Sequence, residues 1–95
     1  MTLGRKISSM MEIGKKYTLD DLVKMLWAEH ERVYDEVFSR EDTPHGYRIK
    51  TPWVLAAESP LIGIRISEEL MHAREAGYVT SELVEREVYY TRIVE

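Results

Sequence analysis

The sequence predicts an α+β fold in which a long helix precedes two shorter helices and a C-terminal β-hairpin. Three observations predict it. Apolar residues recur at helical spacing over residues 18–39, Pro and Gly divide residues 51–77 into two further helical patterns, and residues 78–94 are rich in β-branched and aromatic residues. The 95 residues are expected to form a single domain, because 44% apolar residues supply enough material for one core.

Composition limits the classes of function. The chain has no cysteine, and it has neither a secretory apolar region nor an apolar run of about 18 residues, so we expect a cytoplasmic protein without disulfides or thiolate metal sites. A net charge of −4 argues against a general binder of polyanions. The acids are concentrated in residues 18–43, however, with eight acids and three bases, so another face can still be basic.

Residues 1–17 carry four bases and one acid. Gly4, Ser8, Ser9 and Gly14 disfavour a helix, so we expect an irregular basic arm or a short strand around 11–13. The bases either contact a nucleic-acid backbone or belong to a frayed, soluble terminus, and the second interpretation is preferred.

Residues 18–39 predict a helix, with Thr18 as N-cap and Asp20 and Asp21 in the first turn. At roughly 1.5 Å per residue the helix would be about 30 Å long, more than a small core needs, so we expect it to mediate dimerisation. His30 is interpreted as a core or dimer-interface histidine rather than a metal ligand or pH switch. The residues expected at the dimer interface are Leu22, Leu26, His30, Val33, Tyr34 and Val37.

A loop at 41–46 and a short strand at 47–50 are expected next. Thr51 and Pro52 then predict the start of a helix that continues to about Glu58, where Ser59 and Pro60 end it. The following helix begins either at Pro60 or after Gly63 and runs to Ala76.

Gly77 is expected to end that last helix in the left-handed conformation. Its spacing predicts one face packed on the core and one facing out. The inner face comprises Ile62, Ile66, Leu70 and Ala73, and the outer face comprises Arg65, Glu68, His72 and Glu75. Residues 78–84 and 88–94 should pair as a hairpin across 85–87, with one of Tyr89 and Tyr90 buried and the other exposed.

Two C-terminal stretches carry a family resemblance. Residues 73–81, Ala-Arg-Glu-Ala-Gly-Tyr-Val-Thr-Ser, and residues 86–93, Arg-Glu-Val-Tyr-Tyr-Thr-Arg-Ile, resemble the recognition helix and wing strands of winged helix-turn-helix regulators such as the MarR, ArsR and PadR groups. Residues 54–63 also resemble a segment of PadR regulators. The small size and absence of cysteine resemble winged-helix proteins of archaea, their plasmids and viruses. The resemblance implies a winged helix-turn-helix fold and a homodimer that binds double-stranded DNA and regulates transcription.

Seven residues are the candidates for DNA contact. They are Lys50, Thr51, Arg65, Glu68, His72, Arg86 and Arg92. Each has an ordinary alternative: a capped helix start at Thr51, a solvated helix face with an Arg65–Glu68 pair, and pairing of Arg86 or Arg92 with Glu82 or Glu85. The alternative function is a winged-helix module that contacts another protein without binding DNA.

No catalytic or cofactor motif is present in the sequence, so we expect neither enzyme activity nor a cofactor. Three scattered histidines without cysteine give no zinc signature, and no nucleotide-binding glycine loop occurs. Trp27 and Trp53 are expected to anchor the core. No sequence feature calls for a small-molecule effector.

Overall fold

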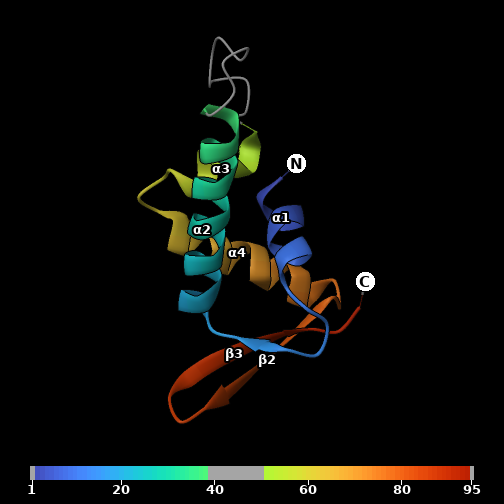
Figure 1. Ribbon diagram of the computed structural model, residues 1–95. Helices are drawn as coiled ribbons and strands as arrows, with labels where there is room; N and C mark the ends of the chain where they lie inside the picture. Colours follow the sequence, from blue (N-terminus) through green and yellow to red (C-terminus); the bar gives the residue numbers. More distant parts are fainter. Residues whose placement is uncertain (1, 39–50, 95) are drawn as a thin grey trace.

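The computed structural model describes residues 2–38 and 51–94, with the side chains of residues 2–33 and 51–94. In chain order the elements are α1 (Leu3–Met10), β1 (Lys16–Tyr17), α2 (Leu19–Phe38), α3 (Pro52–Ala57), α4 (Ile62–Glu75), β2 (Val79–Val84) and β3 (Glu87–Arg92). The strands form an antiparallel sheet in the order β1-β3-β2, with the helices gathered on one side of it (Figure 1). The expected α+β class is therefore confirmed. None of the described helices is both long and apolar enough to cross a bilayer.

Residues 3–10 form a helix, so the expectation of an irregular arm is wrong for them, whereas the alternative of a short strand around 11–13 is met in part by the β-bridge between Ile13 and Arg92. Leu3, Ile7 and Met11 recur every four residues and are all buried, which gives α1 an apolar stripe that packs on the core. Thr2 caps the helix, because its hydroxyl accepts a hydrogen bond from the Arg5 amide. Burial of this stripe outweighs the low helix propensity of the glycine and serines.

The start of α2 is as expected. The Asp21 amide donates to the Thr18 hydroxyl at 3.1 Å, and the Thr18 amide donates to the Asp21 carboxylate at 3.0 Å, which satisfies two amides that the helix itself cannot. The hydrogen bond from the Thr18 amide is also the main cause that lowers the pKa of Asp21.

The edge strand of the sheet lies shortly after residues 11–13, around which the sequence analysis allowed a short strand. β1 pairs with β3, with Lys16 opposite Thr91 and Tyr17 opposite Tyr90. Tyr17 is buried and its hydroxyl accepts from the Glu12 amide, which fixes the approach to the strand. In chain order the long helix α2 thus follows β1 directly and precedes α3. The loop expected at 41–46 and the strand expected at 47–50 lie outside the described residues.

Helices α3 and α4 agree closely with the expected boundaries. Pro52 opens α3, and α4 begins at Ile62, between the two starts that the sequence left open. Gly77, with φ of +86°, ends the helical segment as expected. Ile66 and Leu70 are fully buried, and the flanking Ile62 and Ala73 are partly buried, so the inner face of α4 is confirmed.

The hairpin turns through two residues rather than the three expected. Glu85 and Arg86 connect Val84 to Glu87, and their φ values are +49° and +71°. Two successive residues with positive φ form the primed turn that matches the twist of a hairpin, but the residues favoured there are Asn and Gly. The turn is thus built from two residues whose side chains disfavour this conformation.

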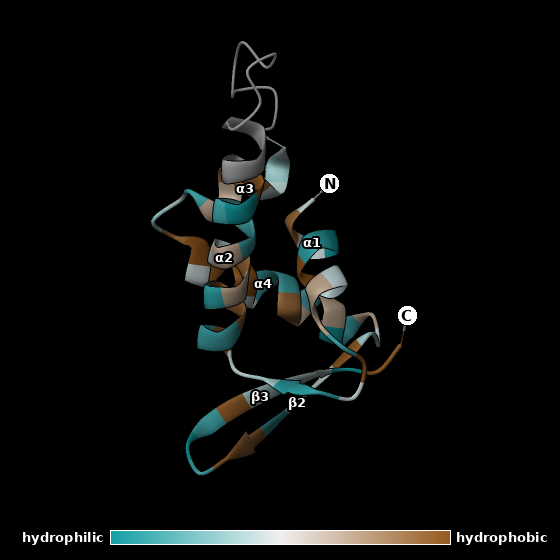
Figure 2. Ribbon diagram, viewed as in Figure 1, coloured by the Kyte–Doolittle hydropathy of each residue, from teal (hydrophilic) through white to brown (hydrophobic). Residues whose placement is uncertain are grey.

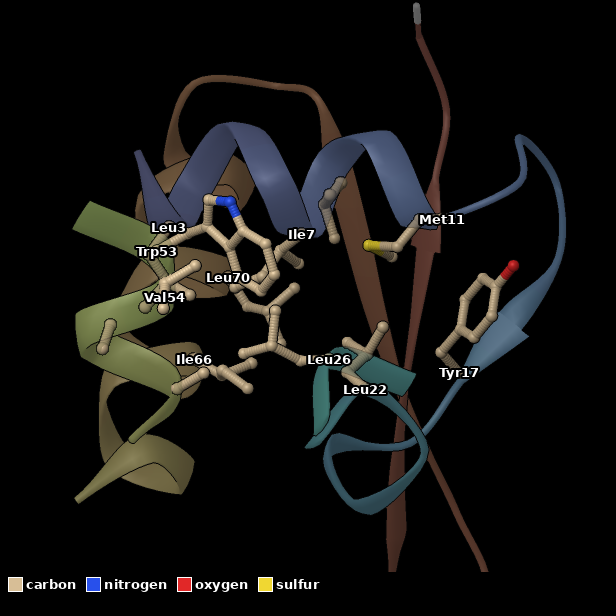
Figure 3. Packing of buried hydrophobic residues seen from close by; sticks show 13 residues of the cluster. Leu3, Ile7, Met11, Tyr17, Leu22, Leu26, Trp53, Val54, Ile66 and Leu70 are labelled. Atoms are coloured by element: carbon tan, nitrogen blue, oxygen red, sulfur yellow. The ribbon is translucent and has the colours of Figure 1, made fainter. Parts of the chain in front are cut away.

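The core lies where the helices meet above the sheet (Figure 3). Trp53 is 5% exposed and anchors it as expected, whereas Trp27 is 46% exposed, so the prediction that it is a core residue is wrong. Neither Tyr89 nor Tyr90 is fully buried or fully exposed, although Tyr90 packs against the core. The buried apolar side chains are Leu3, Ile7, Met11, Tyr17, Leu22, Leu26, Trp53, Val54, Ala56, Ala57, Ile66, Leu70 and Val79.

Candidate functional site

The outer face of α4 is exposed to solvent, as the sequence predicts. Arg65, Glu68, His72 and Glu75 are all exposed. No ion pair joins Arg65 to Glu68 in the part of the chain that the structure describes. The expected alternative, a salt-bridged pair on a solvated face, is therefore not what the structure shows at these two residues.

The same face is more apolar than we expected from the sequence. Leu61, Ile64 and Met71 are 57%, 59% and 52% exposed. Their spacing of three and seven residues places them on one side of the helix, and this spacing was the signal that could have revealed the stripe. The exposed face of α4 therefore combines an apolar stripe with charged side chains of both signs.

The hairpin lies beside this face and extends it. Ser67, Met71 and Arg74 of α4 line a hollow of about 190 Å³ together with Tyr90 of β3. Arg74, which was not among the predicted site residues, donates from Nη1 to the Ser81 hydroxyl at 3.0 Å and so ties the helix to β2. The ribbon of the hairpin includes hydrophobic positions beyond the core (Figure 2). One of its residues, Leu83, is 70% exposed. Helix and hairpin thus form one continuous surface.

Arg86 stands at the tip of that surface. Its side chain is exposed, and it takes part in none of the ion pairs among the described residues. A hollow beside it is shared by the turn and the first residues of α2, including Asp20. Neighbouring Glu85 and Glu87 are also exposed, so the tip carries one base between two acids.

Most of the hydrogen-bond donors of Arg92 are engaged within the chain rather than free for the DNA contact that we expected. Its guanidinium donates from Nη1 to the carbonyls of Ser8 at 2.6 Å and Met11 at 3.2 Å, and from Nε to the Val94 carbonyl at 2.8 Å. It therefore ties the C-terminal end of α1 to β3. The expected alternative, pairing with Glu82 or Glu85, is also wrong for this residue.

The two candidates ahead of α3 do not form a described site. Lys50 lies outside the described residues. The hydroxyl oxygen of Thr51 is buried and accepts no hydrogen bond within the described part of the chain, so it does not cap α3 and does not face a phosphate. The prediction of a phosphate contact from the Thr51 side chain is therefore wrong.

The residues expected at a dimer interface belong largely to the chain's own core. Leu22, Leu26 and His30 are 0%, 1% and 7% exposed, so their side chains leave no surface for a second copy. Val33 packs against the same core. The side chains of Tyr34 and Val37 lie outside the described ones. The prediction is wrong for the buried three because α1 and α4 already cover this face of α2.

His30 is a core histidine held between aromatic rings. Trp27 stacks on it with centroids 4.7 Å apart and planes at 7°, and Trp53 meets it edge-on at 6.5 Å. Its Nε2 lies 3.3 Å from Oε1 of Glu58. Among the described residues no group of three His, Cys, Asp or Glu side chains is arranged to hold a metal ion.

The basic residues near the N-terminus are mostly engaged within the molecule. Lys6 pairs with Glu29 and lies over the Trp53 ring, Lys15 lies over the ring of Tyr17, and Lys16 pairs with Glu82 across the sheet. Arg5 alone of the four bases has no such partner among the described residues. Three of these bases are therefore engaged within the molecule, and the segment that carries Arg5 and Lys6 is helical rather than a frayed terminus.

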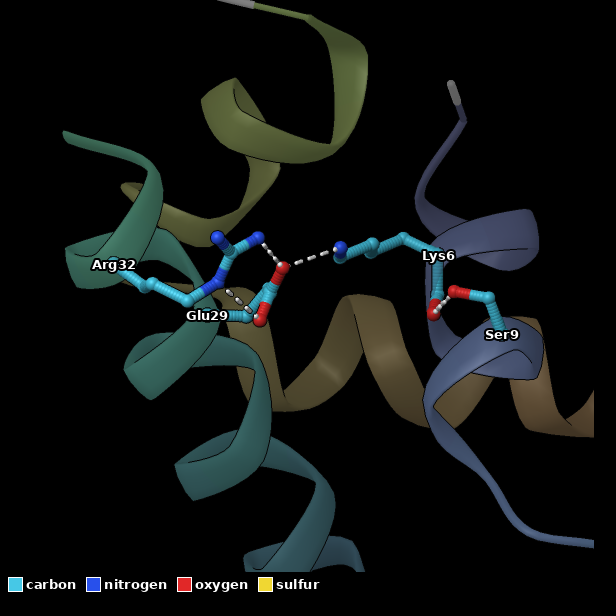
Figure 4. A network of polar contacts seen from close by, with 4 residues as sticks. All are labelled: Lys6, Ser9, Glu29 and Arg32. Atoms are coloured by element: carbon cyan, nitrogen blue, oxygen red, sulfur yellow. Dashed lines mark hydrogen bonds and ion pairs between the residues drawn. The ribbon is translucent and has the colours of Figure 1, made fainter. Parts of the chain in front are cut away.

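Glu29 is the centre of a group of polar contacts that includes Lys6 and Arg32 (Figure 4). Its carboxylate accepts from Nη2 of Arg32 at 2.6 Å and from Nζ of Lys6 at 3.0 Å. The hydrogen bond from Arg32, followed by that from Lys6, lowers the pKa of Glu29 to about 2. This group connects α1 to α2 beside the core.

Comparison with protein-family models, with curated proteins and with solved structures finds no match to this chain. What the protein binds is therefore inferred from its own residues.

Proposed function

We propose that the chain is a winged-helix domain that binds double-stranded DNA and regulates transcription. One observation carries the proposal: α4 leads directly into β2 and β3, and its outer face and the hairpin form a single exposed surface. The topology supports it, because a helix, an edge strand and further helices precede the hairpin, and the sheet order is β1-β3-β2. The major groove of DNA is about 12 Å wide and admits one α-helix. With α4 in the groove, the adjoining hairpin would lie beside the sugar-phosphate backbone of the DNA.

In this proposal Arg65, Glu68 and His72 face base edges, and Arg86 contacts a phosphate or the minor groove. Arg is the common bidentate partner of guanine, and a glutamate accepts from the amino group of cytosine. Arg74 adds a positive charge that already bridges helix and hairpin. Lys50 stays a predicted phosphate contact, while Thr51 and Arg92 are no longer candidates.

Two chains per DNA site remain part of the proposal. The contact between the two chains would use the part of α2 that follows its buried residues. It would place the two copies of α4 about one turn of the DNA helix, or roughly 34 Å, apart on a pseudo-palindrome. Such a pair doubles the phosphate contacts of one chain.

Anisotropy titration of fluorescent duplexes at two salt concentrations tests the proposal. The expected result is salt-sensitive binding that selects a sequence, with two chains per duplex. The double variant Arg65→Ala with Arg86→Asn should lower the slope of log affinity against log salt by about 0.9 for each phosphate that the protein no longer neutralises. Lys24→Ala is the matched control, because Lys24 is exposed on α2 and pairs with Asp20. Absence of binding at low salt would end the proposal.

A second candidate function is contact with another protein through the same surface. The exposed Ile64, Met71 and Leu83 favour it, since apolar side chains gather at the centre of protein interfaces. The acids also favour it, because α4 and the hairpin carry six glutamates against four arginines, one of them engaged with carbonyls. Heparin retention separates the two functions: salt-sensitive retention supports DNA binding, and its absence supports protein contact.

A further inference from the structure

A groove separates α1 from the C-terminal half of α4 and ends against the sheet. Its volume is about 500 Å³, within the range of roughly 300–1,000 Å³ that is typical of sites for small organic ligands. Ile7 of α1, Leu70 and Ala73 of α4 and Val79 of β2 form an apolar floor. Small residues face the groove, Ser8 on α1 and Ala73 and Ala76 on α4, whereas the space beside Gly4 is taken by the carboxylate of Glu69.

Two guanidinium groups lie along the groove. Arg92 is held there by three backbone carbonyls, and Arg5 is exposed on α1. Neither forms an ion pair within the described residues. Glu69 supplies the only carboxylate among the described residues that line the groove, and it lies against Gly4. His72 adds a ring N–H that can donate to an anion.

We propose that this groove binds a small amphipathic organic anion, with an aromatic or aliphatic body on the apolar floor and a carboxylate or sulfonate directed to the arginines. The apolar floor provides most of the free energy of binding. The guanidinium pair sets the charge of the ligand, since a cation in its place would meet like charge on Arg5 and Arg92 and a neutral group would forgo charge-assisted hydrogen bonds.

The site goes beyond DNA binding and does not depend on it. The groove lies on the flank of α4 that holds Glu69, Ala73 and Ala76, whereas Arg65 and Ile64 lie on the outer face, and His72 borders both. Ligand binding is measured on the protein alone, so failure of the DNA proposal leaves the ligand proposal intact, and the converse also holds.

Two fluorescent probes of the same shape test the charge requirement. Anilinonaphthalene sulfonate carries an aromatic body and an anionic group, and phenylnaphthylamine carries nearly the same body without the charge. The sulfonate should bind more tightly to the full chain, with an enhanced and saturable emission. Equal affinity for the neutral probe, or no saturable binding of the sulfonate, overturns the proposal.

Two variants test the place of binding. Arg5→Gln should weaken the sulfonate by roughly fivefold and leave the neutral probe unchanged, since an exposed charge contributes up to about 1 kcal/mol. Ala73→Leu fills the floor and should weaken both probes. Arg65→Gln is the matched control, because it removes an exposed arginine from the other face of α4. Unchanged sulfonate affinity in Arg5→Gln would place the probe elsewhere and refute the site, as would unchanged affinity of both probes in folded Ala73→Leu. Arg5 is exposed, so its variant keeps the test decisive even if Ala73→Leu does not fold.

Discussion

Lys6 and Glu29 join α1 to α2: Lys6 Nζ lies 3.0 Å from Oε1 of Glu29, and the two side chains are only 14% and 25% exposed. The same ammonium group lies 4.6 Å from the centroid of the Trp53 ring. A partly buried ion pair of this kind contributes more to the stability of the fold than a solvated ion pair, because water and salt screen it less.

Removing the ammonium group should destabilise the fold. Lys6→Met leaves Glu29 partly buried with Arg32 alone, and we expect stability to fall by roughly 1–2 kcal/mol, seen as a decrease in Tm of about 4–15 °C. Lys24→Met is the matched control, because Lys24 and Asp20 form a pair whose side chains are 74% and 70% exposed. Thermal denaturation measures both. Equal effects of the two substitutions would show that the partly buried pair has no special role.

Acid should weaken the fold through Glu29. Its pKa is lowered to about 2 in the folded state from 4.5, so its contribution to stability is complete above 4.5 and is lost as the pH falls toward 2. Discounted for partial exposure, this contribution is on the order of 2 kcal/mol. Urea denaturation of Glu29→Gln and of the unsubstituted protein at pH 7 and pH 3 measures it. The variant should lose less stability between the two pH values, and parallel losses would contradict the assignment.

The hairpin turn should be improved by residues that accept positive φ. Replacing Glu85 with Asn and Arg86 with Gly should raise stability by about 1 kcal/mol, because strain at the two positions is relieved. Arg86→Val should lower stability, since a β-branched side chain is disfavoured at positive φ. Both Arg86→Gly and Arg86→Val remove the charge of Arg86. Opposite shifts in Tm of the two variants would therefore identify the positive φ of the backbone as the cause. Shifts of the same sign would instead identify the charge as the cause.

Arg92 should matter for stability and not for DNA. Arg92→Gln removes the donors to Ser8 and Met11, so we expect stability to fall by about 1.5–3 kcal/mol. Duplex affinity per folded molecule should stay within about twofold of the unsubstituted value, because Arg92 faces carbonyls of its own chain. Arg65→Gln is the control with the opposite pattern, since Arg65 is exposed and its side chain forms no hydrogen bond within the described residues. Urea denaturation and anisotropy titration give the two readouts, and reduced DNA affinity without reduced stability would restore Arg92 to the interface.

The elements that the sequence predicts correctly are those with local signals. Thr18 and Asp21 define the start of α2 within four residues, and Gly77 defines the end of the last helical segment. The inner face of α4 follows from periodicity alone. By contrast, α1 contains a glycine and two serines, which obscured the helical spacing of Leu3, Ile7 and Met11, and its helix depends on packing against α3 and α4.

The site was harder to predict because its decisive contacts are distant in sequence. Arg92 is engaged by Ser8, far along the chain, so its sequence neighbours gave no sign that it was occupied. Trp27 and Trp53 looked equivalent, yet the first is half exposed and the second is buried, since only Trp53 lies beneath α1 and Lys6. The exposed face of α4 was predictable because exposure there follows from helical geometry.

The pairing of β1 with β3 also determines when the domain can fold. Tyr17 lies opposite Tyr90, and Arg92 holds the end of α1, so the first segment of the domain is completed by one of the last. During synthesis α2, α3 and α4 are made after β1 but before β3, the strand that pairs with β1. The chain between β1 and β3 forms a long loop, and closing a long loop slows folding. Synthesis of β3 is therefore the step that gives β1 a strand to pair with, whereas α1 already has α3 and α4 to pack against.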